Sequence, residues 1–179
     1  MMRRGLVLLL LTQACLSFPG PRPEPTAPIR AALSLDGRSN IRRFHCVARA
    51  PTAFVARRDR ARFAPGDTAW IATTSRALDC GIGQMNGHLR EAVGRDSATA
   101  IRFDLDSLVR LAADSVALIG RLTIGGRTEV LRASATWRDD GVHGSTPIDI
   151  RRWGIAAPRR FGGLLRVRPL ITVHFFVPT

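Results

Sequence analysis

The side chains that could perform acid–base or nucleophilic chemistry lie far apart in this sequence. The four histidines occupy separate segments, and none has the spacing of a metal-binding motif such as His-Glu-x-x-His. They are His45, His88, His143 and His174. Ser39, Ser97 and Ser145 lack the strand-to-helix turn that exposes a nucleophilic serine. We therefore expect no enzyme, metal or cofactor. A secreted hydrolase stays open as an alternative, because the members of a catalytic triad need not be close in sequence.

Two of the three cysteines are candidates for a structural disulfide. Cys46 and Cys80 lie 34 positions apart, and in an exported domain the simplest pairing is a disulfide between them. The alternatives are a metal pair or two free thiols. Two cysteines without a nearby cluster of His or Asp make a poor zinc site, so the disulfide is favoured.

Arginine supplies all 27 basic side chains, and the formal net charge is +13. The arginines are dispersed and lysine is absent, whereas a nucleic-acid-binding patch normally clusters both residue types on one element; no nucleic-acid partner is expected. Guanidinium groups should still attract anionic lipid or phosphate, which is compatible with contact to a membrane surface. The densest cluster is predicted to contact an anionic head group, with a solvated hairpin as the alternative. Its members are Arg57, Arg58, Arg60 and Arg62. Arg159 and Arg160 form the second cluster.

The N-terminus has the three parts of a secretory signal: a positive flank, an apolar core over 5–11 and a small-residue ending at Ala14. We predict a signal peptide over 1–14 and hence a periplasmic or secreted protein. Cys15 follows directly, either as a lipidation site that anchors the protein to the envelope or as a remnant of the signal. Residues 15–30 are predicted to be a linker, because five prolines between Pro19 and Pro28 cannot join a sheet ladder. The folded domain is expected over 31–179.

Apolar and polar residues alternate with a period of two from residue 31 onward, as in strands with one buried face. In Ile101–Asp106 the odd positions are apolar and the even positions are charged. Gly125-Gly126 separates two alternating runs and predicts a hairpin turn. The eight predicted strands cover about 32–41, 44–57, 68–75, 101–106, 116–124, 131–137, 142–150 and 171–177.

A single segment has convincing helical spacing. Met85, Leu89 and Val93 lie at i, i+4 and i+8, and Asn86 is predicted to cap the start of this helix. Many strands with short turns and one short helix indicate an antiparallel sandwich or barrel.

Three segments in a fixed order carry a family resemblance. They are Leu35–Cys46, Leu78–Phe103 with its Leu78-Asp79-Cys80-Gly81 start, and Gly120–Ile155 with Gly125-Gly126 and Trp153-Gly154-Ile155. Together they resemble the YceI-like family of secreted polyisoprenoid-binding proteins, over about residues 31–177. The resemblance implies an all-β domain, an extended eight-stranded antiparallel lipocalin-like barrel with one short helix, that holds an isoprenoid tail or a similar lipid. The sequence departs from the family pattern at 95–100 and 155–161, which lie near the expected cavity.

An eight-stranded barrel is just wide enough either to be filled by its own side chains or to hold one slender ligand. We predict that fourteen apolar side chains line a ligand cavity. They are Phe44, Trp70, Ile101, Phe103, Leu105, Val116, Leu118, Leu122, Ala133, Ile150, Trp153, Phe161, Val173 and Phe175. In the alternative interpretation the same side chains fill a solid core, and the protein is a membrane-tethered structural or interaction domain without a ligand.

Overall fold

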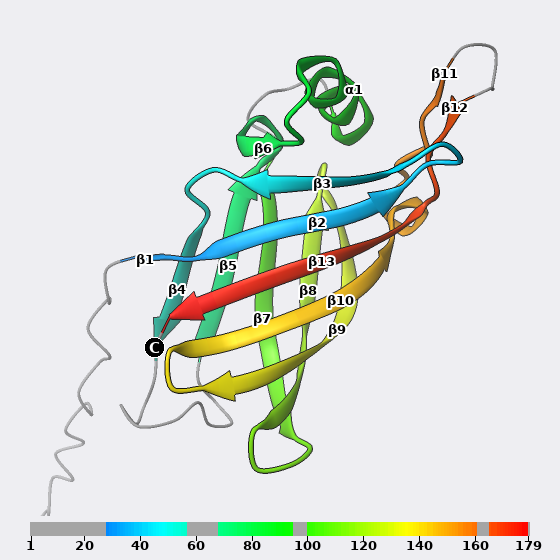
Figure 1. The fold of residues 1–179 in the computed structure, drawn as a ribbon. Coiled ribbons are helices and arrows are strands. Elements are labelled where there is room, and N and C mark those ends of the chain that lie inside the picture. The colour runs from blue at the N-terminus through cyan, green and yellow to red at the C-terminus, as the bar shows by residue number, and fades with distance from the viewer. Residues whose placement is uncertain (1–27, 57–67, 95–99, 161–164, 179) are drawn as a thin grey trace, which may run out of the picture.

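The computed structural model of the chain describes residues 28–56, 68–94, 100–160 and 165–178. These residues form one large antiparallel sheet, one α-helix, α1 (Gly83–Val93), and two 3-10 turns, η1 (Ser75–Ala77) and η2 (Ile150–Trp153) (Figure 1). A separate ribbon pairs β11 (Arg159–Arg160) with β12 (Leu165–Arg166). The strands of the large sheet are β1 (Ile29–Arg30), β2 (Ala32–Arg38), β3 (Arg43–Ala48), β4 (Thr52–Ala56), β5 (Thr68–Thr74), β6 (Leu78–Asp79), β7 (Ala100–Arg110), β8 (Ser115–Ile124), β9 (Arg127–Arg138), β10 (Gly141–Asp149) and β13 (Leu170–Pro178).

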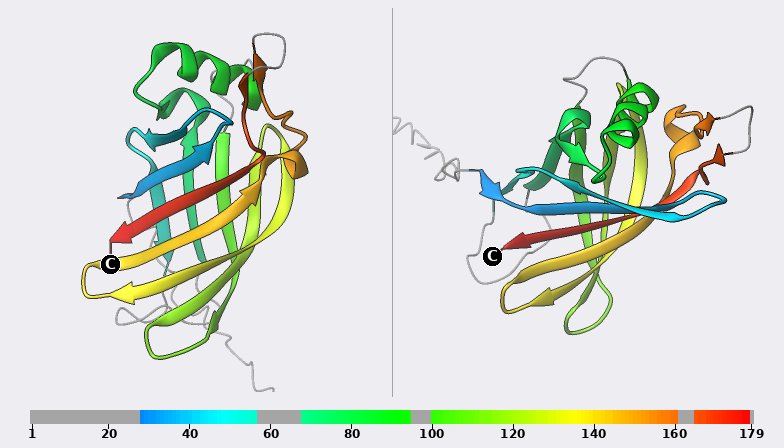
Figure 2. Two further views of the ribbon diagram at one scale, coloured as in Figure 1. Left: turned by 45° about the vertical axis from the view of Figure 1, so that its right-hand side comes forward. Right: turned by 45° about the horizontal axis from the view of Figure 1, so that its top comes forward.

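The eleven strands follow the order β1-β4-β5-β7-β8-β9-β10-β13-β2-β3-β6 and curl into a half-barrel (Figures 1 and 2). Neighbouring strands are antiparallel, as the alternating sequence predicts. The longest ladders are β7 with β8 and β8 with β9, and the turn between β8 and β9 is the predicted Gly125-Gly126. Both glycines have positive φ, 59° and 80°, which this tight hairpin requires.

The prediction of eight strands was wrong, and the reason lies at one corner of the sheet. One expected strand, 44–57, is divided there into β3 and β4. Two short strands outside the expected ranges are added at the same corner: β6, and β1, which lies within the segment 15–30 that was predicted to be a linker. Ala31 separates β1 from β2, residues 49–51 separate β3 from β4, and η1 separates β5 from β6. Pro51 has no N–H to give to a ladder, which explains the second break. Backbone bonds hold this corner: Ala31 N–H donates to Pro51 O over 3.2 Å, and Arg49 N–H donates to Ala77 O over 2.8 Å.

The predicted helix is present as α1, but its N-terminal cap is not Asn86. Ile82 occupies the cap position without a side-chain hydrogen bond. Asn86 lies one turn inside α1, where its Oδ1 accepts from Cys80 N–H over 2.7 Å and its Nδ2 donates to Asp79 over 2.9 Å. Its side chain therefore ties α1 to the preceding strand β6. The predicted disulfide between Cys46 and Cys80 is confirmed, and it links β3 to this same segment.

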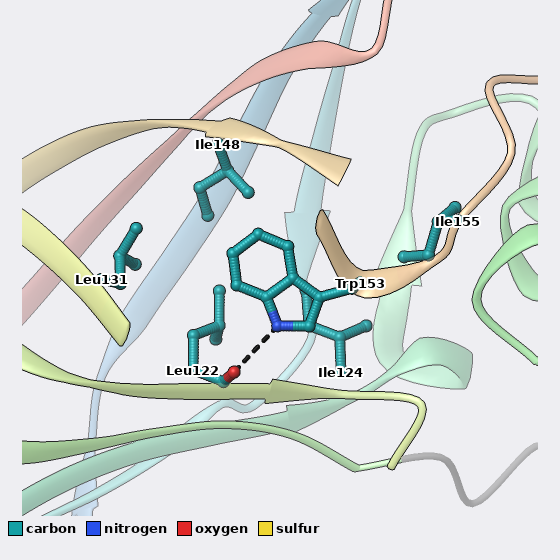
Figure 3. Packing of buried hydrophobic residues seen from close by; sticks show 6 residues of the cluster. All are labelled: Leu122, Ile124, Leu131, Ile148, Trp153 and Ile155. Atoms are coloured by element: carbon teal, nitrogen blue, oxygen red, sulfur yellow. Dashed lines mark hydrogen bonds between the residues drawn. The ribbon is translucent and has the colours of Figure 1, made fainter. Parts of the chain in front are cut away.

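Trp153 belongs to a cluster of buried apolar residues in the interior. Its side chain is only 4% exposed, and its Nε1 donates to Leu122 O over 2.8 Å (Figure 3). The η2 turn that presents Trp153 ends at Gly154 in the left-handed conformation, which glycine adopts without strain. The other buried members of this cluster are Leu122, Ile124, Leu131, Ile148 and Ile155.

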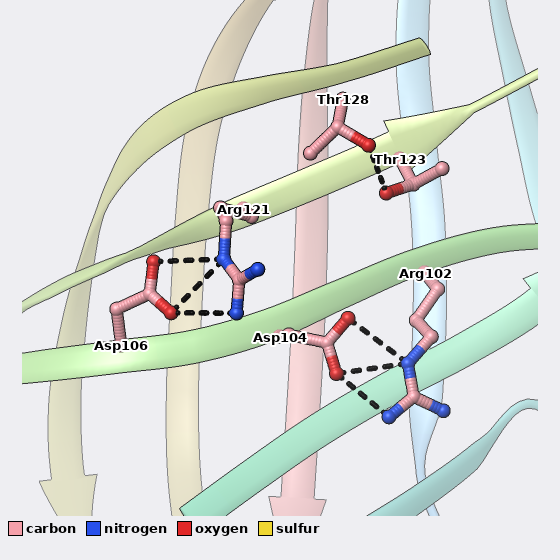
Figure 4. Close-up of polar contacts among 6 residues, drawn as sticks. All are labelled: Arg102, Asp104, Asp106, Arg121, Thr123 and Thr128. Atoms are coloured by element: carbon pink, nitrogen blue, oxygen red, sulfur yellow. Dashed lines mark hydrogen bonds and ion pairs between the residues drawn. The ribbon is translucent and has the colours of Figure 1, made fainter. Parts of the chain in front are cut away.

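The outward face of β7, β8 and β9 is polar and paired. Arg102 forms a forked contact with Asp104, and Arg121 does the same with Asp106 from the neighbouring strand (Figure 4). The contact with Asp106 raises the pKa of Arg121. Exposed pairs of this kind add little stability, but they neutralise Arg102 and Arg121.

Candidate binding cavity

The inner face of the half-barrel encloses a cavity of about 490 Å³. Its walls come from the inward positions of the large sheet and from residues of α1. The helix α1 lies over one end of the half-barrel (Figure 2). This volume falls within the range of roughly 300–1,000 Å³ that is usual for small-molecule sites. The lining is almost entirely apolar, as expected for a binding site that excludes water.

Most of the side chains predicted to line a cavity do so. The structure brings twelve of them together at the cavity: Phe44, Trp70, Ile101, Phe103, Leu105, Val116, Leu118, Leu122, Ala133, Ile150, Val173 and Phe175. Trp153 is not among the lining residues, although the other five members of its buried cluster are. Phe161 lies outside the described residues.

Trp70 belongs to the lining, but its ring has another set of contacts. The indole stacks on Phe54 with the ring centres 5.9 Å apart, and the Arg102 guanidinium lies 4.4 Å from the indole centre. On β5, Ala69, Ile71 and Thr73 alternate with Trp70, and all three also line the cavity. A binding role for the Trp70 ring is therefore weaker than for the side chains of these alternating positions.

Three phenyl rings border the cavity where the neighbouring strand carries a glycine. A Cβ on Gly37 would lie 2.1 Å from Cζ of Phe44, and one on Gly144 would lie 2.1 Å from Cζ of Phe175. Each of these glycines is directly opposite its phenylalanine in the ladder. Gly120 is similarly covered, with Cζ of Phe103 at 2.6 Å. Because the rings fold over glycine instead of standing into the interior, they leave space between the walls of the half-barrel.

One face of α1 covers one end of the cavity. Met85, Leu89, Ala92 and Val93 all line it, and no residue of α1 is fully buried. This helix was expected to pack against the barrel, but its side chains were not predicted as site residues. The i, i+4, i+8 spacing of Met85, Leu89 and Val93 was the available signal.

The N-terminal end of α1 is fixed to the sheet through Asp79. The carboxylate accepts from Asn86, from Arg49 and from Gly81 N–H. The bond from Asn86, followed by those from Arg49 and Gly81, lowers the pKa of Asp79 far below its ordinary value. Together with the Cys46–Cys80 disulfide, this carboxylate holds the helix over the cavity.

Few polar groups face the cavity, and they come from several elements, including Ser34 on β2. Gln84 and His88 come from α1, and Arg42 comes from the hairpin. Thr73 on β5 also lines the cavity; it is 8% exposed, and its Oγ1 has no hydrogen-bond partner in the described part of the chain. Thr146, in contrast, donates to Arg132 O over 3.1 Å. The arginines predicted to meet a head group, Arg57, Arg58, Arg60 and Arg62, lie outside the described residues.

Leu108 lines the cavity and was missed because β7 is irregular. The ladder with β8 shifts register between Leu105 and Ser107. The inward-facing positions of β7 are therefore odd-numbered up to Leu105 and even-numbered at Leu108. The strict alternation of Ile101–Asp106 does not predict this shift.

The histidines do not assemble a catalytic or metal-binding group. His45 and His174 both contact Asp36, at 2.8 and 3.0 Å, and all three side chains are about half exposed on the surface. These contacts, that of His45 first, lower the pKa of Asp36. The described lining of the cavity contains His88 but neither Asp nor Glu; His88 Nδ1 lies 3.7 Å from the carboxylate of Glu91, which is not a lining residue. No cluster of His, Cys, Asp or Glu suited to a metal ion occurs among the described residues.

Comparison with known proteins adds evidence at the level of the fold. No protein-family model matches the sequence, and no curated protein matches it either. Solved structures do match. BcnA from Burkholderia cenocepacia shares 15% identity with a TM-score of 0.70, over 83% of this chain and 96% of that chain. The Campylobacter jejuni YceI protein shares 13% identity with a TM-score of 0.61, over 75% of this chain and 82% of that chain.

The chain has the YceI-like fold. A polyisoprenoid-binding domain from Saccharophagus degradans, implicated in plant cell wall breakdown, has the same architecture. It shares 11% identity with a TM-score of 0.59, over 86% of this chain and 94% of that chain. The resemblance seen in the sequence is thus confirmed as a YceI-like fold. Among the described residues, no helix is long and apolar enough to span a bilayer.

Proposed function

We propose that this YceI-like protein is a binding protein that holds an isoprenoid-type or similar amphiphilic lipid in the cavity of its half-barrel. The observation that carries the proposal is the cavity of about 490 Å³ with an apolar lining. The polyisoprenoid-binding domain with the same fold supports this choice of ligand class. The twelve predicted side chains at the cavity, with Leu108 and the apolar face of α1, are the proposed ligand contacts.

Burial of hydrocarbon alone can drive such binding. Each methylene removed from water contributes about 0.8 kcal/mol, so one five-carbon isoprene unit contributes roughly 4 kcal/mol before ordering costs. A few units therefore suffice for tight binding, and no charged anchor is required. The function proposed is that of a carrier or store and involves no catalytic step.

Thr73 favours an amphiphile over a pure hydrocarbon. A buried hydroxyl without a partner costs free energy, and an oxygen of a bound ligand would satisfy it. Thr73→Val should therefore weaken capture of a prenol more than capture of a hydrocarbon of the same length. Equal effects on both probes would contradict this role of Thr73.

The alternative, a membrane-tethered structural or interaction domain with a filled core, is less well supported. That interpretation requires the inward side chains to meet without a gap, whereas Phe44, Phe103 and Phe175 lie over glycines beside an open volume. The disulfide is compatible with a periplasmic or secreted location, which we propose on the basis of the sequence. The signal peptide over 1–14, the linker over 15–30 and the lipidation of Cys15 belong to that proposal.

The experiment that tests the proposed function is extraction of the protein from its own envelope, followed by native mass spectrometry. A bound lipid of defined mass is expected, and a consistently empty protein would contradict the proposal. Ala133→Leu should displace about two methylene groups of ligand from the cavity and weaken capture of a fluorescent prenol roughly tenfold. Ser134→Leu, on the exposed face of the same strand, is the matched control and should bind normally.

The head-group role of Arg57, Arg58, Arg60 and Arg62 has its own test. Changing these four residues to Gln should weaken capture of a prenyl pyrophosphate but not of the parent prenol, because only the phosphates attract guanidinium groups. Equal losses for both ligands would remove this assignment.

A further inference from the structure

The tip of the β2–β3 hairpin carries an exposed apolar residue surrounded by arginines. Ile41 is 72% exposed, the most exposed large apolar side chain among the described residues. Arg38, Arg42 and Arg43 flank it in the sequence and are all exposed. Such a combination, one apolar anchor within a basic rim, is typical of loops that contact anionic membranes.

A second segment adds to the same tip. Ser39 forms a bridge with Val167; Asn40 N–H donates to Arg166 O over 3.0 Å, and Arg168 N–H donates to Arg38 O over 2.8 Å. These contacts bring Arg166 and Arg168, both exposed, against the hairpin. We call the five arginines and Ile41 the arginine tip; its members are Arg38, Ile41, Arg42, Arg43, Arg166 and Arg168.

The arginine tip is rigid because of Ser39. This side chain is 5% exposed; its Oγ accepts from the N–H groups of Ile41 and Arg42 and donates to Arg42 O over 3.0 Å. The turn is thus held in one shape that projects Ile41 into solvent. A preformed tip loses little conformational entropy when it meets a surface.

The charge of the tip is not neutralised locally, in contrast to the outward face of the sheet. Arg102 and Arg121 are paired with aspartates on β7. Residues 37–44 and 165–170 contain no acidic residue, and Arg38, Arg42, Arg43 and Arg168 have no ion pair in the described part of the chain. Four guanidinium groups therefore remain available to an anionic partner.

The arginine tip is continuous with the cavity. Arg42 and Val167 line the cavity, as does Phe44, two residues further along β3. A surface bound to the tip would therefore meet the cavity at this end.

We propose that the arginine tip docks the protein onto an anionic lipid bilayer, with Ile41 inserted at the interface, so that lipid passes between the bilayer and the cavity at this end. This inference rests on the proposed function, because it names the surface from which the cavity is filled. Anionic head groups, and not soluble phosphates or nucleic acid, are the partner that also accommodates the exposed Ile41.

The test uses the full-length chain with Cys15→Ser, so that no acyl group contributes, and flotation with vesicles of phosphatidylcholine alone or mixed with phosphatidylglycerol. The tip variant combines Ile41→Ser, Arg38→Gln and Arg43→Gln and leaves Arg42 in place. The matched control combines Val130→Ser, Arg110→Gln and Arg138→Gln, which removes the same charge and an apolar residue that is 62% exposed. Circular dichroism verifies that each variant is folded.

The parent and the control should bind the anionic vesicles, less so as salt is added, and should bind neutral vesicles weakly. The tip variant should partition at least about 25-fold less, since each of the two arginines near an anionic surface contributes about a factor of five and the loss of Ile41 adds to this. Equal losses in both variants, equal binding to neutral vesicles, or no binding by the parent would each overturn the docking proposal.

Capture of a fluorescent prenol in buffer without vesicles, measured on the same samples, separates the two proposals. If the parent captures the prenol but vesicle binding does not depend on the tip, docking alone is contradicted. If the parent fails to capture the prenol, the proposed function is contradicted.

Discussion

Around Trp153 a large side chain fills the interior of the half-barrel, whereas along Phe44, Phe103 and Phe175 the interior stays open because each ring folds over a glycine. Both regions are built on the same alternating strands, and the five residues that are buried with Trp153 also border the cavity. What differs is the position of the aromatic rings: the indole of Trp153 is buried and bonded to Leu122 O, whereas the phenyl rings lie against glycines and line the cavity. Alternation decides which side chains point inward, and the glycines decide whether they meet.

The largest loss of stability is expected when the side chain of Trp153 is truncated. Trp153→Ala should lower the free energy of unfolding by about 3–5 kcal/mol, because it leaves a cavity in the cluster and removes the donor to Leu122 O. Phe175→Ala borders a volume that is already open and should cost clearly less. Urea denaturation of both variants measures the difference, and equal costs would contradict the distinction between the two regions.

Removal of the disulfide should loosen the open region and spare the filled one. Cys46→Ser with Cys80→Ser releases a link across 34 residues and should cost about 2–4 kcal/mol. Hydrogen exchange should then quicken in α1, which the disulfide helps to hold over the cavity, more than in β8. Uniform quickening throughout the sheet would show that the cross-link stabilises the whole fold and not the cover of the cavity.

A methyl group under one phenyl ring should disturb the open region directly. Gly144→Ala would place a Cβ 2.1 Å from the present position of Cζ of Phe175, so the ring must move away from the strand. We expect a loss of stability of about 1–3 kcal/mol and weaker prenol capture. Gly87→Ala is the control: nothing lies within 4 Å of its Cβ position in α1, and it should stabilise by about 0.5–1 kcal/mol. Unchanged capture by Gly144→Ala would indicate that the ring does not define the cavity.

The smallest effect on stability is expected when the pH is lowered. The pKa of Asp79 is lowered in the folded protein, so its contribution to stability is present above the ordinary carboxyl pKa of about 3.9 and is lost as the pH falls below it. Hydrogen exchange at the start of α1 should therefore quicken at low pH. Asp36, Asp140 and Asp149 also have lowered pKa values, so the comparison is made with Asp79→Asn. An identical pH profile in that variant would show that Asp79 does not fix the helix.

The fold class, the disulfide and most of the cavity lining could be predicted from the sequence. These features depend on the alternation of apolar residues along each strand and on the number and spacing of the cysteines. Period-two alternation placed Val116, Leu118 and Leu122 on one face, and Gly125-Gly126 fixed the register of the longest hairpin. Three features were out of reach. The corner at Ala31 and Pro51 depends on pairing between distant strands, and the phase change before Leu108 depends on a bulge.

The third feature is the pairing of glycine with phenylalanine across strands. Gly144 and Phe175 are far apart in the sequence, and only the register of β10 with β13 places them opposite each other. Gly120 could be recognised as a small inward residue, but its effect on Phe103 could not. Inward-facing side chains can thus be predicted from one sequence. The space between them can be predicted only when the register of the neighbouring strands is known.

Ala31 is the single residue between β1 and β2, and its position also bears on how the curled sheet is held together. Through it, one continuous stretch of backbone pairs at one edge of the curled sheet and also near the other end of the strand order, with Ile29–Arg30 on β4 and the following residues between β13 and β3. A protease cut at this residue would sever one of three chain crossings at this corner, because residues 49–51 also join β3 to β4 and η1 joins β5 to β6. The two remaining crossings and the hydrogen bond from Arg49 N–H to Ala77 O should keep the two ends of the curled sheet together, so the nicked protein should retain its fold.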